Sequence, residues 1–314
     1  MTRIARSFAE TTDFQPSAVT IGKFDGVHAG HRHLIRQVID AAKERGVAPS
    51  VLTFDRHPAT VVAPDKAPQP LIPVEERCRL LGELGVAQIL VLPFTSEVAS
   101  LTPREFVDVY LRDAMRARVV LVGSNFRFGH KQAGNPDVLR ELGAEAGFEV
   151  RMVDSCTLRG GMVSTSEVRQ ALQAGNVSLA GRLLTRPYAL AGEVVRGHGV
   201  GSKQTVPTLN LKTEAKILPA DGVYITRTRD LESERRWNSI TNIGMRPTFE
   251  GDARTIETFL LEPLAGNGPE RIEVEFLRRV REERKFESPD ALKQQIFKDV
   301  GRAQTYFRRT EKVG

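Results

Sequence analysis

The fold of this chain is decided by the stretch Gly22-Lys23-Phe24-Asp25-Gly26-Val27-His28-Ala29-Gly30-His31. The apolar residues 17–21 before it predict a buried strand, and the apolar residues at helical spacing from 34 to 42 predict a helix that Gly46 ends. The glycines and both histidines are therefore expected on a strand-to-helix turn. Exposed backbone N–H groups and the positive end of a helix favour phosphate binding at such a turn.

The residue types in this turn fit phosphate chemistry. Gly26 and Gly30 have no Cβ, so a phosphate could approach the backbone closely. His28 and His31 would place two imidazoles on the charge that develops at a phosphorus atom. A short His-x-Gly-His pattern is equally compatible with an ordinary surface or core turn, but the longer pattern with residues 24–26 favours phosphate chemistry.

The whole turn resembles the signature of the nucleotidylyltransferases, and in its Gly-x-Phe-Asp-Gly-x-His-x-Gly-His form it resembles that of the bacterial FAD synthetases. The resemblance implies that ATP binds along this turn and that the two histidines are catalytic. The implied ATP-binding residues of the turn are Gly22, Phe24, Gly26 and Gly30.

Length and composition limit the class of protein. A chain of 314 residues predicts two domains, and 40% hydrophobic residues are enough for full cores. No apolar stretch approaches the ~20 residues of a membrane span, and the only cysteines, Cys78 and Cys156, are isolated. We therefore expect a cytoplasmic protein with no membrane partner.

The net charge of +6 would suit an anionic partner, either a nucleotide or a nucleic acid. However, the basic residues of 278–285 are interleaved with Glu282 and Glu283, which favours a solvated face of mixed charge. No nucleic acid partner is expected.

The first half alternates continuous apolar strands with amphipathic helices. Strands are predicted near 51–54, 89–92, 119–123 and 148–150, and helices near 74–84, 103–115 and 137–146, with a capping box at Thr102 and Glu105. This alternation predicts an α/β Rossmann-like domain with a parallel sheet covered on both faces. Ligands of such sheets bind at the carboxyl ends of the strands.

Three segments near those ends carry candidate chemistry, and each also has a purely structural interpretation. Residues 55–58, Asp-Arg-His-Pro, follow a strand and could be a simple turn. Residues 123–129 could hold a base or a flavin ring, but their two phenylalanines could equally fill the core. Residues 164–169 open a helix with the spacing of a capping box, which is also a suitable seat for pyrophosphate.

These segments resemble, in order, the corresponding elements of the FAD synthetases. The departures are Arg56, where that family more often has proline, and Glu167, at a position that is commonly basic. The resemblance implies flavin binding by His57, Pro58, Asn125, Phe126, Arg127 and Phe128. It implies phosphate binding by Ser164, Thr165 and Arg169.

The second half has a strand-like period from about residue 186, where we place the domain boundary. Short alternating strands near 188–195, 207–211, 221–225, 239–244, 255–261 and 272–276 predict a small antiparallel β-barrel. Ser288 and Pro289 then open a final helix with Leu292, Ile296 and Val300 on one stripe.

Two features of this half suggest a second phosphate site. The glycine-rich residues 197–203 could hold phosphates through backbone amides, and Glu257 lies on a predicted strand, where an exposed carboxylate would be the ordinary interpretation. The order of the glycine-rich loop, Pro-Thr-x-Asn, Asn-Ile-Gly-x-x-Pro-Thr-Phe and a strand glutamate resembles riboflavin kinase, although residues 204–206 depart from that family.

The second resemblance implies a magnesium-dependent kinase site. It implies phosphate binding by Gly199, Gly201 and Lys203, Mg²⁺ ligation by Thr208 and Asn210, and catalysis by Glu257 at the ribityl hydroxyl. Both halves together resemble the bacterial bifunctional riboflavin kinase/FAD synthetases.

We therefore expect an FMN adenylyltransferase domain at residues 1–185 and a riboflavin kinase domain at 186–314. The expected substrates are riboflavin, FMN and ATP, with FMN and FAD as products and Mg²⁺ as cofactor. Two alternatives stay open: a nucleotidyltransferase for another phosphorylated acceptor, and a non-catalytic flavin-binding regulator. The sequence does not fix the oligomeric state.

Overall fold

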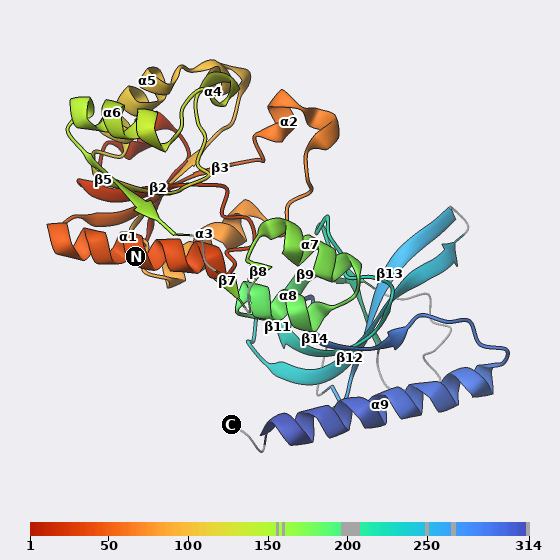
Figure 1. Cartoon of the computed structure of the whole chain (residues 1–314). Coiled ribbons are helices and arrows are strands. Elements are labelled where there is room, and N and C mark those ends of the chain that lie inside the picture. Colours follow the sequence, from red (N-terminus) through yellow and green to blue (C-terminus); the bar gives the residue numbers. More distant parts are fainter. Residues whose placement is uncertain (155–156, 159–160, 196–207, 249–250, 265–267, 312–314) are drawn as a thin grey trace. The chain divides into compact units, whose positions relative to one another are not determined.

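The computed structural model describes residues 1–154, 157–158, 161–195, 208–248, 251–264 and 268–311 (Figure 1). The chain forms two compact units, Met1–Thr165 and Ser166–Gly314. Each unit is described by itself.

The first unit contains a parallel sheet. The strands lie in the order β1 (Arg3–Ala5), β4 (Gln88–Leu92), β3 (Ala48–Phe54), β2 (Ser17–Ile21), β5 (Ala117–Gly123) and β6 (Glu149–Val153), and every neighbouring pair is parallel. Every residue of β2 and β4 is buried, as expected of strands covered on both faces. The predicted parallel sheet is confirmed; the short edge strand β1 was not among the predicted strands.

Helices cover both faces of this sheet (Figure 1). On one face, α1 (Ala29–Arg45) packs Val38 and Ala42 against Ala18 of β2 and Leu121 of β5. The other face is covered by α5 (Pro103–Phe106), η3 (Val107–Ala114) and α6 (Pro136–Ala146). The predicted capping box is present at the start of α5. The predicted helix near 74–84 is α3 (Val74–Glu83).

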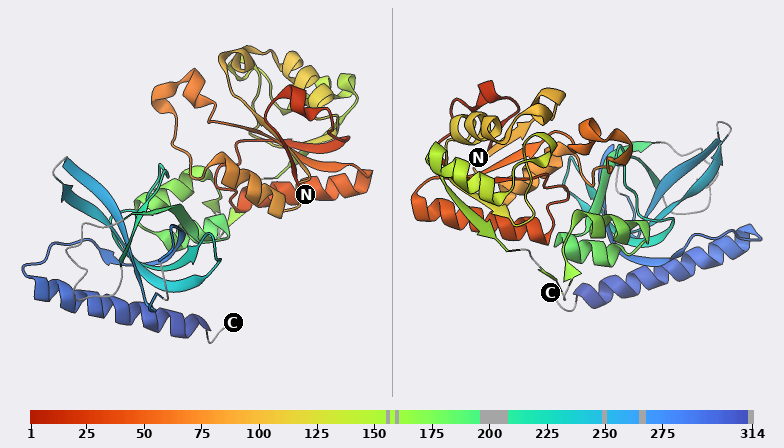
Figure 2. Two further views of the ribbon diagram at one scale, coloured as in Figure 1. Left: turned by 180° about the vertical axis from the view of Figure 1, so that it is seen from behind. Right: turned by 45° about the horizontal axis from the view of Figure 1, so that its top comes forward.

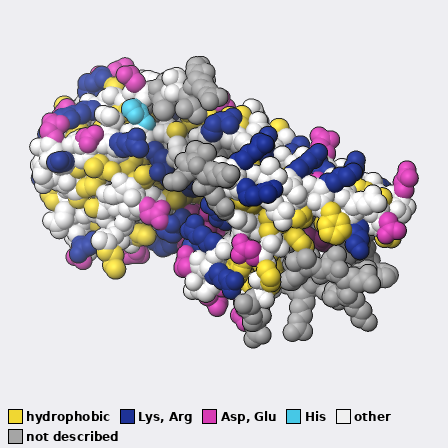
Figure 3. All heavy atoms as spheres, turned by 90° about the horizontal axis from the view of Figure 1, so that it is seen from below, with side chains coloured by type: hydrophobic (Ala, Val, Ile, Leu, Met, Phe, Trp, Pro, Cys, Tyr) yellow, Lys and Arg dark blue, Asp and Glu magenta, His cyan; other side chains and the backbone are white. Residues whose placement is uncertain are grey.

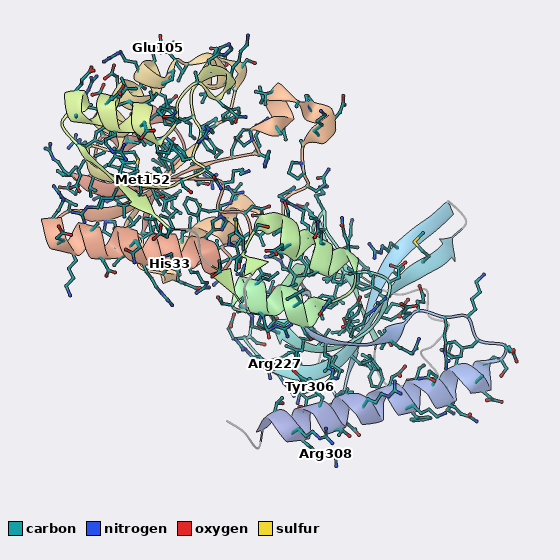
Figure 4. All side chains as sticks on the ribbon, viewed as in Figure 1. His33, Glu105, Met152, Arg227, Tyr306 and Arg308 are labelled. Atoms are coloured by element: carbon teal, nitrogen blue, oxygen red, sulfur yellow. The ribbon has the colours of Figure 1, made fainter. Side chains whose placement is uncertain are left out.

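The remaining elements of this unit are short. They are η1 (Phe8–Thr11), α2 (Ala59–Val62), η2 (Pro64–Lys66), α4 (Ser96–Ser100), η4 (His130–Gln132) and the hairpin of β7 (Thr157–Leu158) and β8 (Gly161–Met162). In Figure 4 the labelled side chains His33, Glu105 and Met152 mark the positions of α1, α5 and β6.

The second unit contains a closed antiparallel barrel, as predicted (Figure 2). Its strands are β10 (Thr208–Lys212), β13 (Gly251–Leu260), β12 (Arg236–Thr248), β11 (Gly222–Asp230), β14 (Arg271–Glu282) and β9 (Tyr188–Val195), and β9 pairs with β10 to close it. Side chains alternate along these strands between the interior and the outer face.

The interior of the barrel holds hydroxyl groups as well as apolar side chains. Thr226 Oγ1 lies 2.8 Å from both Ser239 Oγ and Thr241 Oγ1, and Thr241 Oγ1 lies 2.9 Å from Thr258 Oγ1. Each of these residues has no exposed surface. Because each hydroxyl both donates and accepts, the chain of bonds satisfies these groups without water.

The C-terminal helix α9 (Pro289–Glu311) covers part of the outer face of the barrel. Its buried residues Ala303 and Phe307 pack against Val223 and Ile225 of β11. Tyr306 lies on the same side of the helix, whereas Arg308 points away from the barrel (Figure 4). The helix is therefore held by an apolar stripe, to which Val300 of the predicted stripe contributes. The prediction is wrong for Leu292 and Ile296, which are 42% and 38% exposed because they line an open pocket instead of packing on the barrel.

Two helices precede the barrel and pack with it. In α7 (Thr165–Gln173), Leu172 O accepts a hydrogen bond of 3.0 Å from Ala220 N, and in α8 (Val177–Leu184), Ser178 Oγ donates to Leu277 O at 3.0 Å. By its contacts the second unit thus begins before residue 186. The boundary between the two activities, placed at 185/186, stays a prediction.

Candidate active sites

The turn between β2 and α1 is tight and well anchored. Gly26 has a φ of 79°, in the left-handed region that glycine adopts easily. Phe24 and Val27 also have positive φ, 49° and 43°, and both side chains are completely buried. The core therefore holds this strained turn in one conformation, which fixes the position of the histidines that follow.

The two histidines of the turn lie together at the start of α1. Their rings stack with centroids 3.7 Å apart and an angle of 15° between planes. His28 is the N-cap, and its Nδ1 accepts a hydrogen bond of 3.4 Å from the backbone N–H of His31. A Cβ on Gly30 would lie 3.2 Å from His28 Cε1, so glycine leaves room for the capping ring.

Both imidazoles are held in the neutral form. Burial lowers the pKa of His28 from 6.5 to about 4. The pKa of His31 is lowered well below its usual value, first by burial and then by electrostatic interaction with His28, Arg77 and Lys23, which disfavours a positive charge on the His31 ring. Since His28 Nδ1 accepts a hydrogen bond, the neutral ring carries its proton on Nε2, where it can be donated to an anionic oxygen.

His57 lies near the same edge of the sheet. It follows β3, which neighbours β2, and its Nε2 is 3.0 Å from Lys23 Nζ. His57 Nδ1 accepts a hydrogen bond of 3.1 Å from Ala59 N. Pro58, half-buried, is the N-cap of α2.

The loop after β5 combines exposed and core residues. Asn125 and Arg127 are exposed, and Arg127 Nη1 donates to Phe126 O at 2.7 Å. Phe128 is buried in the core and stacks on the half-buried Phe126 with centroids 5.4 Å apart. The structure therefore places Phe128 as a core residue, and flavin binding by this loop stays a prediction.

The segment that leads to Ser164 passes the start of α1. A Cβ on Gly30 would lie 3.4 Å from Val163 O, the residue before Ser164. Thr165 begins α7, as the predicted helix start requires. Arg169, half-buried, lies on α7 in the second unit.

In the barrel unit, Glu257 on β13 lies directly opposite Asn210 on β10 and Asn242 on β12. Thr208 is opposite Phe259, two residues from Glu257. Because directly opposed residues and residues two apart share one face of a sheet, all five side chains lie on the outer face of the barrel.

A pocket of about 740 Å³ opens on this face. Thr208, Asn242, Glu257 and Phe259 line its barrel side. The other side is made by residues 283–289 and by Leu292 and Ile296 of α9. A carboxylate is thus placed beside hydroxyl and amide groups in a pocket that also has apolar walls. The predicted site residues Gly199, Gly201 and Lys203 lie outside the described residues.

Charged side chains at the rim of the pocket form a partly buried network. Arg281 Nε donates to Asp299 Oδ2 at 2.8 Å, and Asp299 is 2% exposed. The guanidinium carbons of Arg281 and Arg284 lie 5.5 and 5.0 Å from the ring centre of Phe286. The expectation that 278–285 is only a solvated mixed-charge face is therefore wrong for Arg281, because its buried carboxylate partner comes from α9.

Several residues of these sites were not among the predicted site residues. Asn242, Arg281 and Asp299 line the pocket, and Lys23 contacts His57. The Asn-Ile-Gly motif contained a signal for Asn242, since the resemblance to riboflavin kinase includes this motif just before the strand of Glu257. For Asp299 the local sequence offers no signal.

A parallel sheet with paired histidines at its turn, together with a barrel that holds a carboxylate beside hydroxyl and amide groups in a pocket, defines a phosphate-transfer enzyme with two active units. Residues 10–167 match the family model of FAD synthetase, and residues 184–307 match that of riboflavin kinase. The chain belongs to the family of bifunctional riboflavin kinase/FMN adenylyltransferases. The predicted family, the predicted fold and the predicted pair of activities of that family are confirmed.

Curated relatives carry both activities in their names. A bifunctional riboflavin kinase/FMN adenylyltransferase of Escherichia coli K12 is 34% identical over 293 residues, which are 93% of each chain. That of Pseudomonas fluorescens is 36% identical over 90% of this chain and 91% of its own. That of Bacillus subtilis is 33% identical over 94% of each.

A crystal structure described as a macrolide-efflux protein from Streptococcus pneumoniae superposes with a TM-score of 0.86, at 29% identity over 96% of this chain and 98% of the other. Its description applies to that protein alone. None of the helices in the described part of this chain is both long and apolar enough to cross a membrane.

Proposed function

We propose that the barrel unit phosphorylates riboflavin with ATP to give FMN, and that the sheet unit adenylylates FMN with a second ATP to give FAD and pyrophosphate. The observation that carries the proposal is the placement of Glu257 opposite Asn210, in the wall of a 740 Å³ pocket. The relatives named above support the same pair of reactions. We assign residues 1–185 to adenylylation and 186–314 to the kinase, since the riboflavin kinase family model begins at residue 184.

In the kinase reaction, Glu257 would orient the ribityl hydroxyl and accept its proton. The oxygen then bonds to the γ-phosphorus of ATP while the bond to the β-phosphate oxygen breaks, leaving ADP. We assign Gly199, Gly201 and Lys203 to the phosphates of ATP.

Thr208 and Asn210 are the proposed ligands of Mg²⁺. Their hydroxyl and amide oxygens share one face of β10, and oxygen is the donor that Mg²⁺ prefers. The described residues contain no group of three or more His, Cys, Asp and Glu placed to hold a metal, but Mg²⁺ commonly binds through one or two protein ligands and the substrate phosphates. When bound, the ion neutralises charge on the transferring phosphate.

In the adenylyl transfer, an oxygen of the FMN phosphate attacks the α-phosphorus of ATP and pyrophosphate leaves. The nucleophile is already an anion, so the enzyme needs no general base and acts by stabilising charge. His28 and His31 would donate to the α-phosphate from their neutral rings. The backbone at Gly22, Phe24, Gly26 and Gly30 would receive ATP, and Ser164, Thr165 and Arg169 would hold the leaving pyrophosphate.

We assign flavin binding in this unit to His57, Pro58, Asn125, Phe126, Arg127 and Phe128. Because Phe128 is a core residue, its part would be to position Phe126, whose ring it stacks against. We further propose that the protein works in the cytoplasm, where ATP is supplied and where the thiol of the buried Cys78 stays reduced.

The proposal is tested by incubating the purified protein with riboflavin, ATP and Mg²⁺ and separating the flavins over time. Riboflavin should disappear first into FMN and then into FAD, with ADP and pyrophosphate as the other products. If FMN formed without FAD, the proposed adenylyl transfer would be wrong. If neither riboflavin nor FMN were converted, the protein would instead be a flavin-binding regulator. Omission of Mg²⁺ should stop both steps.

A further inference from the structure

One polar side chain in the wall of the barrel pocket has no part in the proposed reactions. The polar residues that the barrel strands contribute to this wall are Thr208, Thr241, Asn242 and Glu257. Thr208 is a proposed ligand of Mg²⁺, and Glu257 is the proposed base. The hydroxyl of Thr241 lies inside the barrel, where it bonds to two other hydroxyls at 2.8 and 2.9 Å. Of the described residues of this wall, Asn242 therefore remains without a role.

Asn242 is placed beside the proposed base. It is directly opposite Glu257 in the pairing of β12 with β13, and directly opposed residues have Cβ atoms about 5 Å apart. Because side chains alternate along a strand, Thr241 turns to the interior of the barrel and Asn242 to the outer face, where it lines the pocket. Asn242 is half-buried, and its carboxamide forms no hydrogen bond within the part of the chain that the structure describes. A group that both donates and accepts is thus available to a ligand in the pocket.

Apolar side chains adjoin Asn242 on the side away from Glu257. Val223 on β11 is directly opposite Asn242, and Ile240 precedes Asn242 by two residues on the same face of β12. Both apolar residues line the pocket. Asn242 therefore lies where the apolar part of the barrel wall meets the carboxylate. A ligand that joins a flat ring to a hydroxyl-bearing chain fits such a boundary, because a few placed polar groups fix the orientation of a ligand in a pocket with apolar walls.

The chemistry of riboflavin matches this boundary. Riboflavin has a flat aromatic ring, and its ribityl chain ends in the 5′-hydroxyl that the proposed kinase phosphorylates. The 4′-hydroxyl is on the next carbon of the chain. When the 5′-hydroxyl is at Glu257, the 4′-hydroxyl is therefore within reach of a side chain directly beside that residue. A hydroxyl donates one hydrogen bond and accepts others, and a carboxamide supplies a partner for both.

We propose that Asn242 binds the 4′-hydroxyl of riboflavin and so makes the kinase specific for flavins that carry a hydroxyl at this position. The inference rests on the proposed kinase reaction and adds a specificity-determining residue to it. The bond holds the end of the chain so that the 5′-oxygen faces the γ-phosphorus of ATP while Glu257 accepts the proton. A site built to hydrogen-bond a substrate hydroxyl rejects an analogue without it, because the carboxamide is then left unpaired.

The test compares riboflavin with 4′-deoxyriboflavin as substrates of the full chain, at saturating ATP and Mg²⁺. For the parent, kcat/KM should be about tenfold lower with the deoxy analogue. Asn242→Leu, which keeps a branched side chain without hydrogen-bonding groups, should lower kcat/KM for riboflavin by about the same factor. The variant should then phosphorylate the two flavins with kcat/KM values within about threefold of each other, because the partner of the 4′-hydroxyl is already gone. Asn242→Ala, a smaller change, should show the same loss of preference.

Asn238→Leu is the matched control, since Asn238 is on the same face of β12 but is not among the residues that line the pocket. This variant should keep the preference of the parent for riboflavin. Urea unfolding followed by the fluorescence of Trp237, also on β12, shows whether the barrel of each variant is folded.

Three results would overturn the inference. The first is a parent that uses both flavins equally well, a result that needs no variant. The second is a preference for riboflavin that survives in Asn242→Leu while both rates fall together, because Asn242 would then only support Glu257. The third is an effect confined to the concentration of Mg²⁺ required, which would make Asn242 a metal ligand. A parent that phosphorylates neither flavin would instead overturn the proposed function.

Discussion

Asn210 on β10 and Glu257 on β13 are directly opposite one another in the antiparallel barrel. The pairing places the proposed metal ligand and the proposed base on the same face, at the usual spacing of about 5 Å between Cβ atoms. Asn242 flanks Glu257 from the other side, on β12. A proton acceptor between two carboxamides and beside the hydroxyl of Thr208 is suited to receive an alcohol that attacks a metal-bound triphosphate.

The first prediction concerns this carboxylate. Glu257→Gln keeps the shape of the side chain but removes the proton acceptor, so the rate of FMN formation should fall at least a hundredfold, at the lower end of the contribution of a general base. Formation of FAD from added FMN should be unchanged. Glu275→Gln, the same change on β14, is the control and should leave both rates intact. If Glu257→Gln formed FMN as fast as the control, Glu257 would not be the base of the kinase reaction.

The second prediction concerns the stacked pair. His28→Ala with His31→Ala should reduce FAD formation at least a hundredfold, because two donors to the developing charge are lost. Riboflavin should still be converted, so FMN accumulates, which chromatography of the flavins detects. His33→Ala on the same helix is the control (Figure 4). FAD appearing at the parent rate in the double variant would contradict the assignment.

The sequence was sufficient for the local parts of both sites. The strand–turn–helix around His28 and the alternation that puts Glu257 and Phe259 on one face follow from spacing alone. The register that sets Asn210 against Glu257 does not, because a shift of one residue would turn the side chain to the other face at no local cost.

Other features depend on partners distant in the chain. Arg281 looks like one member of a solvated run until Asp299 arrives from α9, and the contact of Lys23 with His57 joins two loops that only the sheet brings together. Charge over the visible surface is interspersed, with basic side chains in the majority (Figure 3). A run of charged residues in the sequence, such as 278–285, therefore does not show which of its members has a buried partner.

The third prediction is a loss of stability of the sheet unit in mild acid. The unfolded chain protonates His28 near pH 6.5, whereas the folded chain resists protonation until about pH 4. The unfolded state thus binds more protons between these values, and stability falls as the pH falls. The contribution of His28 should be about 2 kcal/mol between pH 7 and pH 5.

Urea unfolding of the parent and of His28→Asn at both pH values measures this. The asparagine can still accept the His31 N–H but does not titrate, so the variant should lose less stability than the parent on acidification. His33→Asn serves as the control and should follow the parent. Equal pH dependence in His28→Asn and the parent would show that His28 has an ordinary pKa.

The fourth prediction concerns the hydroxyls inside the barrel. Within this network, the hydroxyl of Thr226 bonds to both Ser239 and Thr241, whereas the hydroxyl of Thr228 bonds to Ser239. Thr226→Val should therefore destabilise the barrel by about 2 kcal/mol, and Thr228→Val by about half of that. Urea unfolding followed by the fluorescence of Trp237, which is on β12, measures the difference. The reverse order of the two variants would contradict the network.

The last prediction concerns the ion pair that joins α9 to the end of β14. Asp299→Ala leaves the guanidinium of Arg281, whose side chain is 17% exposed, without the carboxylate 2.8 Å away. Breaking a largely buried pair in this way should cost about 3 kcal/mol. Because both residues line the pocket, the KM for riboflavin should rise as well, while adenylylation of added FMN should be retained.

The double variant Arg281→Met with Asp299→Leu separates the loss of the pair from the loss of packing. Replacing both charges by apolar side chains of similar size removes the uncompensated charge, so the double variant should be more stable than Asp299→Ala alone. Urea unfolding and kinase kinetics on the same preparations measure both effects. If the double variant were no more stable than the single one, the loss would come from packing of α9 rather than from an unpaired guanidinium. In that case the pocket wall would depend on the apolar stripe of Ala303 and Phe307 instead.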